Sequence, residues 1–263
     1  MEPQMSEFSY GYCLTEELME GPAHRLLGAP IFPTQRQEGQ FGGYDLEIPR
    51  NGIPLFLQFK LSDYLTRSNS LEWNLHGQPY YRVFLRRRDK SDQHRLMVEW
   101  QAAGHEILYS APVFHTQDEL SARYNDARVV ESSAFFRPGD IGFLQDDRQH
   151  YVTFAPGARI AFSHSESPKQ IKPPTLGLQI FDELSEVLER RRIDYDEAFF
   201  RGLIQELSDL SQTAKNPALI RRIVDFDAPI RANPLHQIAI RAARIAWALL
   251  DSQLVLLHDQ PPY

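Results

Sequence analysis

Residues 42–61 read GGYDLEIPRNGIPLFLQFKL, and this stretch decides which fold the sequence predicts. The segment Pro-Arg-Asn-Gly at 49–52 is typical of a tight turn, and a strand-like run lies on each side of it. We therefore expect the two runs to pair as an antiparallel hairpin, with Ile48 directly opposite Ile53.

The predicted hairpin sorts its side chains, because successive residues of a strand point to opposite faces. Asp45, Gln58 and Lys60 fall on one face, and the other face is apolar. A carboxylate, an amide and an ammonium group are thereby expected together at the ends of two adjacent strands. Phosphodiester hydrolysis uses such groups: oxygen ligands hold a divalent ion, and a lysine orients the water or stabilises developing charge.

The neighbouring segments supply an order of elements. A short helix is expected around residues 15–19, and strands are expected at 80–85 and 107–111. Ser91 is a candidate cap for a helix between these two strands. His94 in its first turn is expected at the surface or in a capping role, although it could also face the site from this helix. With the hairpin, the predicted order is helix, three strands, helix, strand.

In this order of elements, Asp45 followed by Gln58-Phe59-Lys60 resembles the PD-(D/E)xK nuclease superfamily. The closest likeness is to the variant of the Mrr-type restriction endonucleases, which has Gln in place of the second acid. Over residues 12–112, the resemblance implies a restriction-endonuclease-like α/β core with a mixed central sheet and flanking helices. It also implies that Asp45 and Gln58 bind Mg²⁺ or Mn²⁺ and that Lys60 is catalytic.

The resemblance leaves the ligand set incomplete. Tyr44 stands where the name-giving proline would be, and Gln58 removes one negative charge from the metal site. Some members of the superfamily add a glutamate from the first helix, for which Glu16 or Glu17 is the match. Glu17 and Glu38 are therefore expected as additional metal ligands, although Glu38 also fits an ordinary loop carboxylate.

These residues imply a Mg²⁺-dependent DNA endonuclease that uses metal-activated water, in the setting of bacterial defence against foreign DNA. Two other interpretations stay open. Asp45 and Lys60 also fit a cross-strand ion pair on a solvated sheet face, worth less than about 1 kcal/mol. The chain also fits a catalytically inactive nuclease-fold subunit that binds or assembles through its helical tail.

Composition restricts the kind of DNA contact. The 263 residues carry a formal net charge of −7 and are 42% hydrophobic, which indicates a folded protein without a bulk positive surface. Residues 50–95 are locally basic, and candidates for phosphate contact follow the strand at 80–85: Arg86, Arg87, Arg88 and Lys90. The same four residues also fit a solvated charge cluster at a strand end.

Other classes of site find no support in the sequence. The single cysteine, Cys13, excludes an internal disulfide and thiolate metal sites, and it fits a reducing compartment. The sequence has no phosphate-binding loop, no GxGxxG, no HExxH and no GxSxG motif. No secretory signal or membrane-length apolar run is present, so a cytoplasmic location without membrane contact is expected.

The chain is expected to divide into two parts. Residues 1–162 form the nuclease-like α/β domain, residues 163–175 form a polar, proline-containing linker, and residues 176–263 form an all-helical domain. Apolar residues at helical spacing, such as Leu184 and Leu188, support the helical interpretation. The helices of this region are the expected surface for homo-oligomers or a partner protein.

Overall fold

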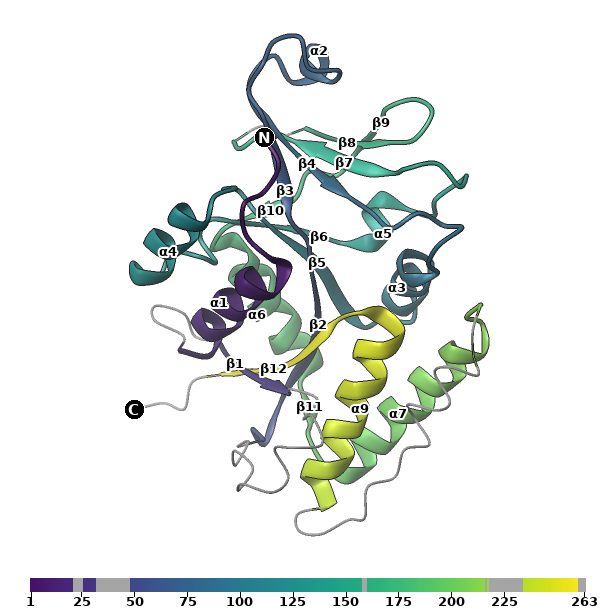
Figure 1. The fold of residues 1–263 in the computed structure, drawn as a ribbon. Helices are drawn as coiled ribbons and strands as arrows, with labels where there is room; N and C mark the ends of the chain where they lie inside the picture. Colours follow the sequence, from purple (N-terminus) through teal and green to yellow (C-terminus); the bar gives the residue numbers. More distant parts are fainter. Residues whose placement is uncertain (21–25, 32–47, 158–159, 216, 218–233, 260–263) are drawn as a thin grey trace.

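Strand β2 (Asn51–Phe59) lies inside a mixed sheet and is hydrogen-bonded to a neighbour on each side. β12 (Gln253–Asp259) pairs with it antiparallel, and β5 (Glu106–Pro112) pairs with it parallel. Both faces of β2 are buried, as expected for an apolar run that is covered on each side. The structure, a computed structural model, describes residues 1–20, 26–31, 48–157, 160–215, 217 and 234–259 (Figure 1).

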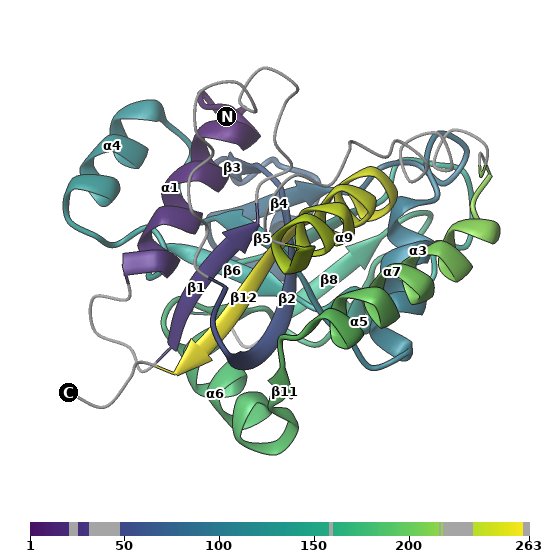
Figure 2. The same cartoon turned by 90° about the horizontal axis from the view of Figure 1, so that it is seen from below.

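The first sheet extends on both sides of these three strands. Its order is β1 (Leu26–Ile31), β12, β2, β5, β6 (Ser133–Phe136) and β10 (Thr175–Leu176), and β11 (Ile193–Asp194) pairs with the start of β2. β2 and β5 form the parallel pair, and α3 (Gln93–Ala102) lies in the connection between them. Figure 2 shows β1, β12 and β2 side by side.

A second, antiparallel sheet continues from the end of β2. Its strands in order are β3 (Ser62–Leu65), β4 (Tyr80–Phe84), β7 (Tyr151–Phe154), β8 (Ala161–His164) and β9 (Lys169–Ile171). The short helix α2 (Trp73–His76) lies in the connection from β3 to β4. Because β3 begins three residues after β2 ends, Lys60 and Leu61 join the two sheets.

Helices cover both faces of the first sheet. Leu55 and Leu57 of β2 share a buried cluster with α1 (Glu7–Glu20), α4 (Gln117–Asn125) and α6 (Gln179–Arg191). Phe56 of β2 belongs to a second buried cluster, which also contains side chains of α3, α5 (Pro138–Ile141), α7 (Glu197–Gln212) and α9 (Pro234–Leu250). None of the helices in the described part of the chain is long and apolar enough to cross a membrane.

The predicted hairpin is wrong. From Ile53 to Leu57, β2 pairs with β12, and from Leu55 to Phe59 it pairs with β5. Phe56 faces Leu254 on one side and Ile107 on the other, which leaves it no edge for a strand at 42–49. The strand β12, about 200 residues later in the chain, pairs with β2 where the predicted hairpin partner would have paired. Residues 42–47, including Asp45, lie outside the described residues.

The predicted all-helical region also needs correction. Residues 176–263 contribute β11 and β12, and β12 lies between β1 and β2. The helix α9 of this region ends at Leu250, where the chain turns and enters the sheet. The expected linker at 163–175 contains β9 and joins β8 to β10.

Several sequence predictions are confirmed. The chain has a mixed α/β fold with a mixed sheet and flanking helices. The strands expected at 80–85 and 107–111 correspond to β4 and β5, and the helix expected between them is α3. The helix expected at 15–19 is the second half of α1.

The position of β12 generates a stability prediction. Leu256→Ala removes a fully buried side chain from β12, so we expect the free energy of unfolding to fall by about 2–5 kcal/mol. Leu71→Ala is the matched control, because Leu71 is 81% exposed and its loss should cost less than about 0.5 kcal/mol. Urea unfolding measures both values. Equal, small effects would contradict the placement of β12 inside the sheet.

Candidate active site

Gln58 and Lys60 lie where the parallel strands β2 and β5 end. The Lys60 backbone N–H donates to the Ser110 carbonyl oxygen at 2.8 Å, so the parallel pairing extends one residue beyond β2. This bond holds the backbone at Lys60 against β5. β12 runs antiparallel to β2 and therefore begins at the same edge of the sheet.

The predicted alternation along this strand is confirmed. Leu55 and Leu57 pack in the cluster with α1 and α6, whereas Phe56 packs in the cluster with α3, α7 and α9. Gln58 and Lys60 follow Phe56 at a spacing of two. Both side chains are buried, at 1% and 5% exposure, so the solvated sheet face of the alternative interpretation does not exist at these positions.

Only one of the two polar atoms of the Gln58 amide has a hydrogen-bond partner among the described residues. Its Nε2 donates to the Phe59 carbonyl oxygen at 3.1 Å, but its Oε1 is buried and accepts no hydrogen bond from any described residue. An unpaired buried acceptor costs about 1–3 kcal/mol. A donor or a cation from a bound ligand would remove that cost, which makes Oε1 a candidate ligand-binding atom.

The Lys60 side chain is almost fully buried, at 5% exposure. In the described part of the chain it makes no hydrogen bond and no ion pair. Burial lowers the pKa of Lys60 below its usual value of 10.5, and the positive charge of Arg86 lowers it further. Glu7 and Asp251 act in the opposite direction. A lysine in this state is closer to a proton acceptor at neutral pH than an exposed lysine is.

Asp251 is a carboxylate that sequence analysis missed. It ends α9 with a left-handed backbone, φ 52°, and its N–H donates to the Trp247 carbonyl oxygen at 2.9 Å. The register pairs Gln253 with Leu57, so Asp251 lies level with the end of β2. Its carboxylate forms an ion pair with Arg86 at 2.8 Å. No local motif connects Asp251 with Lys60, because 190 intervening residues separate them.

His94 and Tyr109 form a buried hydrogen-bonded pair near this edge. His94 Nε2 lies 2.7 Å from the Gly142 carbonyl oxygen, and its Nδ1 lies 2.8 Å from the Tyr109 hydroxyl oxygen. Burial lowers the pKa of His94 to about 4, so its ring is neutral at pH 7. Since a carbonyl only accepts, Nε2 carries the proton and Tyr109 donates to Nδ1. His94 is therefore buried and faces the sheet, not the surface.

Glu17 has a structural role on the opposite side of the sheet. Its Oε2 accepts the N–H groups of Val129 at 2.5 Å and Val130 at 3.1 Å. α1, which carries Glu17, packs on the face of Leu55 and Leu57. The structure therefore does not bring Glu17 together with Gln58. Glu38, the other additional ligand expected from the sequence, lies outside the described residues together with Asp45.

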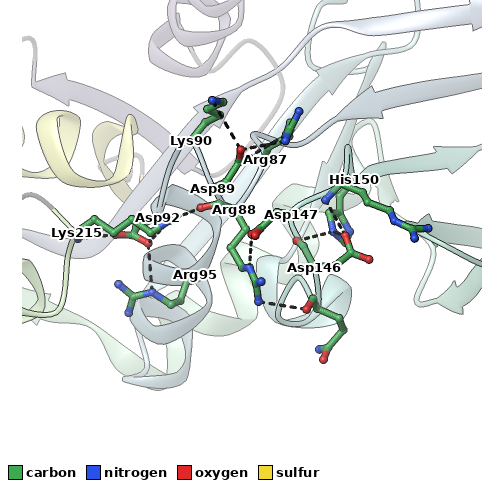
Figure 3. A network of polar contacts seen from close by, with 12 residues as sticks. Arg87, Arg88, Asp89, Lys90, Asp92, Arg95, Asp146, Asp147, His150 and Lys215 are labelled. Atoms are coloured by element: carbon green, nitrogen blue, oxygen red, sulfur yellow. Dashed lines mark hydrogen bonds and ion pairs between the residues drawn. The ribbon is translucent and has the colours of Figure 1, made fainter.

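The four basic candidates are paired with carboxylates. Arg86 contacts Asp251. Figure 3 shows the other three basic residues in a network with neighbouring aspartates. Arg87 binds Asp89 at 3.0 Å, Lys90 lies 3.7 Å from the same carboxylate, and Arg88 binds Asp147 at 2.8 Å. Such exposed pairs are weak, typically below about 1 kcal/mol, so they can exchange for phosphate. Their positive charge is largely neutralised in the free protein.

The described residues alone supply few metal ligands. They contain no group of three or more His, Cys, Asp or Glu side chains placed to hold an ion. The unpaired Gln58 Oε1 and the Asp251 carboxylate are oxygen donors of the kind that Mg²⁺ prefers. These donors are too few to hold an ion by themselves, so an ion bound to them takes its other ligands from outside the described residues.

The buried Lys60 generates a prediction about pH and stability. Because its folded pKa is lowered, the unfolded chain binds more protons between that pKa and about 10.5, and stability rises with pH across this window. We expect Lys60→Met to be more stable than wild type at pH 7, with a difference that shrinks as the pH approaches 10. Urea unfolding from pH 7 to pH 10 measures it.

Lys169→Met is the control, because Lys169 is exposed on β9 and should show no such convergence. A wild type that is more stable than Lys60→Met at pH 7 would indicate that Lys60 is held by an ion pair, contrary to its described surroundings.

The chain was compared with known proteins, and no protein-family model, no curated protein and no solved structure matches it.

Proposed function

We propose that this protein is a Mg²⁺- or Mn²⁺-dependent endonuclease that hydrolyses phosphodiester bonds in DNA, acting in bacterial defence against foreign DNA. One observation carries the proposal. The buried Gln58 amide oxygen has no hydrogen-bond partner among the described residues, and two residues on, the Lys60 side chain is 5% exposed and forms no ion pair with any of them.

A purely structural role does not explain this pair. Buried polar atoms in folded proteins are nearly always hydrogen-bonded, and a buried lysine normally has a carboxylate beside it. Groups left in this state are concentrated at functional sites, where a ligand completes their contacts. The pair also matches the Gln-x-Lys part of the nuclease motif, which assigns metal binding to the first residue and catalysis to the second.

In the proposed reaction, Gln58, a nearby carboxylate and Lys60 each have a separate role. Gln58 would hold the ion through Oε1, together with the carboxylate of Asp45 or Asp251. A divalent ion bound there supplies neutralisation of the phosphate charge and a bound water of lowered pKa. Lys60 would orient the attacking water and, because its pKa is lowered, accept or return a proton more readily than an exposed lysine does.

Arg86 would contact the substrate by exchanging partners. In the free protein its guanidinium neutralises Asp251 at 2.8 Å, and its side chain is 52% exposed. A phosphate oxygen is an equally good partner for this fork of N–H donors. Moving Arg86 onto phosphate would release the Asp251 carboxylate toward a metal ion. Binding of DNA by Arg86 would thus free Asp251 to complete the metal site.

The alternative function is an inactive subunit that binds a partner through its C-terminal helices. The packing of these helices weighs against it, because α7 and α9 bury their apolar faces against the first sheet. α9 also leads directly into β12 within that sheet. The helices therefore have a role in completing the core, and Trp247, at 56% exposure, is the one large apolar side chain of α9 that faces outward.

Plasmid cleavage tests the proposed activity. In Mg²⁺ or Mn²⁺, we expect Lys60→Ala to lower the rate of nicking or linearisation by about 10²–10⁴-fold, the range for loss of a proton-transfer group. Lys169→Ala is the matched control and should cleave like wild type, since it removes an exposed lysine from β9.

Equal cleavage by wild type and Lys60→Ala would sink the proposal. So would the absence of wild-type cleavage on double-stranded DNA, single-stranded DNA and RNA with either metal. Far-ultraviolet circular dichroism of each variant separates a lost activity from a lost fold.

A further inference from the structure

A cavity of about 310 Å³ lies at the other end of β2 and β5. Ile53 and Pro54 line it from the start of β2, and Glu106 lines it from the start of β5. Helices α6 and α7 close its other walls. At about 3.3 Å per residue, Ile53 lies more than 20 Å from Lys60 along the strand, so the cavity is separate from the candidate active site. Its volume is at the lower end of the range for small-molecule pockets, about 300–1,000 Å³.

The polar wall of the cavity carries the carboxylate of Glu206. The Glu206 carboxylate lies 2.9 Å from Nε2 of His105, and its side chain is 56% exposed. The His105 ring stacks on Trp100, with ring centroids 3.6 Å apart, and burial lowers the pKa of His105. His105 donates one hydrogen bond to this carboxylate, which lines the cavity and has oxygen lone pairs left for a ligand.

The same polar wall carries a positive charge that is only loosely paired. Arg191, in the last turn of α6, donates from Nη2 to the Gly104 carbonyl oxygen at 2.6 Å. Its nearest carboxylate is Glu106, at 3.8 Å, and that group is already held by Arg137 at 2.7 Å. The Arg191 side chain is 52% exposed. Its guanidinium can therefore bind a further anion without breaking a close ion pair.

The rest of the cavity wall is apolar. Val187 of α6 and Phe199 and Leu203 of α7 line it. Gly202, on the same wall, has nothing within 4 Å of the position that a Cβ would occupy. The cavity thus offers open space beside an apolar surface, with one cation and one anion at its polar wall.

We infer that this cavity binds a zwitterionic α-amino acid with an apolar side chain. The Arg191 guanidinium would take the carboxylate, and Glu206 the ammonium group. The side chain would lie on Phe199 and Leu203. A ligand with a single charge would leave Arg191 or Glu206 unmatched, and a polyphosphate would bring several negative charges against Glu206. The inference does not depend on the nuclease proposal.

Isothermal titration of the full chain with L-leucine and L-phenylalanine tests this inference. We expect saturable binding of at least one of them, weakened at least about tenfold by Arg191→Gln and by Glu206→Gln. Gly202→Phe should also abolish binding, because the new ring would occupy the open space beside α7. Arg190→Gln is the matched control: it removes the neighbouring arginine of α6, which does not line the cavity.

Two analogues test the two charges separately. N-acetyl-L-phenylalanine lacks the ammonium group and L-phenylalaninamide lacks the carboxylate, so each should bind at least about tenfold more weakly than L-phenylalanine. No binding of either amino acid at 10 mM (about the weakest affinity that calorimetry resolves) would overturn the inference. Binding that Arg191→Gln and Gly202→Phe leave unchanged would place the ligand elsewhere and overturn it equally.

Discussion

The fold depends on the two-sided pairing of β2. Its backbone groups bond to β12 on one side and to β5 on the other, and its side chains are buried on both faces. This arrangement brings the C-terminal strand of the described chain against a strand near residue 55. It also fixes what happens where β2 ends, because the chain leaves the sheet at Lys60, which is itself buried.

The candidate active site follows from that constraint. Alternation continues past Phe56 and directs Gln58 and Lys60 into the layer between the first sheet and α3, α7 and α9. Desolvating an ammonium group and leaving an amide oxygen unpaired both oppose folding, by several kcal/mol together in ordinary proteins. The large buried clusters on both faces of the sheet are what allow the fold to hold these groups in place. A bound ligand that completes the contacts of Gln58 and Lys60 would offset this cost.

The sequence predicted the parts of the fold that depend on local pattern. Alternation in 53–61, the strands at 80–85 and 107–111 and the helix between them all follow from the spacing of apolar residues, and they are confirmed, although this helix has Asp92 and not Ser91 at its N-cap. The hairpin failed because a turn signal at 49–52 says nothing about which distant strand competes for the same edge. β12 was interpreted as helix because Leu254 to Leu257 is an unbroken apolar run, and such a run has no period that separates a buried strand from a buried helix.

The site divides in the same way. The Gln-x-Lys motif and the alternation of side chains along the strand identify Gln58 and Lys60, and both residues are buried. Asp251 was missed because only the β2–β12 register brings it to this edge. Glu17 was proposed from the helix it occupies, but its carboxylate binds two backbone N–H groups across the sheet from Gln58. Local sequence could not show which face of the sheet α1 would cover.

The central claim is that the Gln58 amide oxygen is left unpaired for a metal ion. Titration of Mn²⁺ into the protein without DNA, followed by calorimetry for wild type and Gln58→Leu, tests it most directly. Leucine keeps most of the buried volume of Gln58 but has no oxygen. The account predicts saturable Mn²⁺ binding to wild type, weakened at least about tenfold in a folded Gln58→Leu. Equal affinity in both proteins, or no binding to wild type, would contradict it.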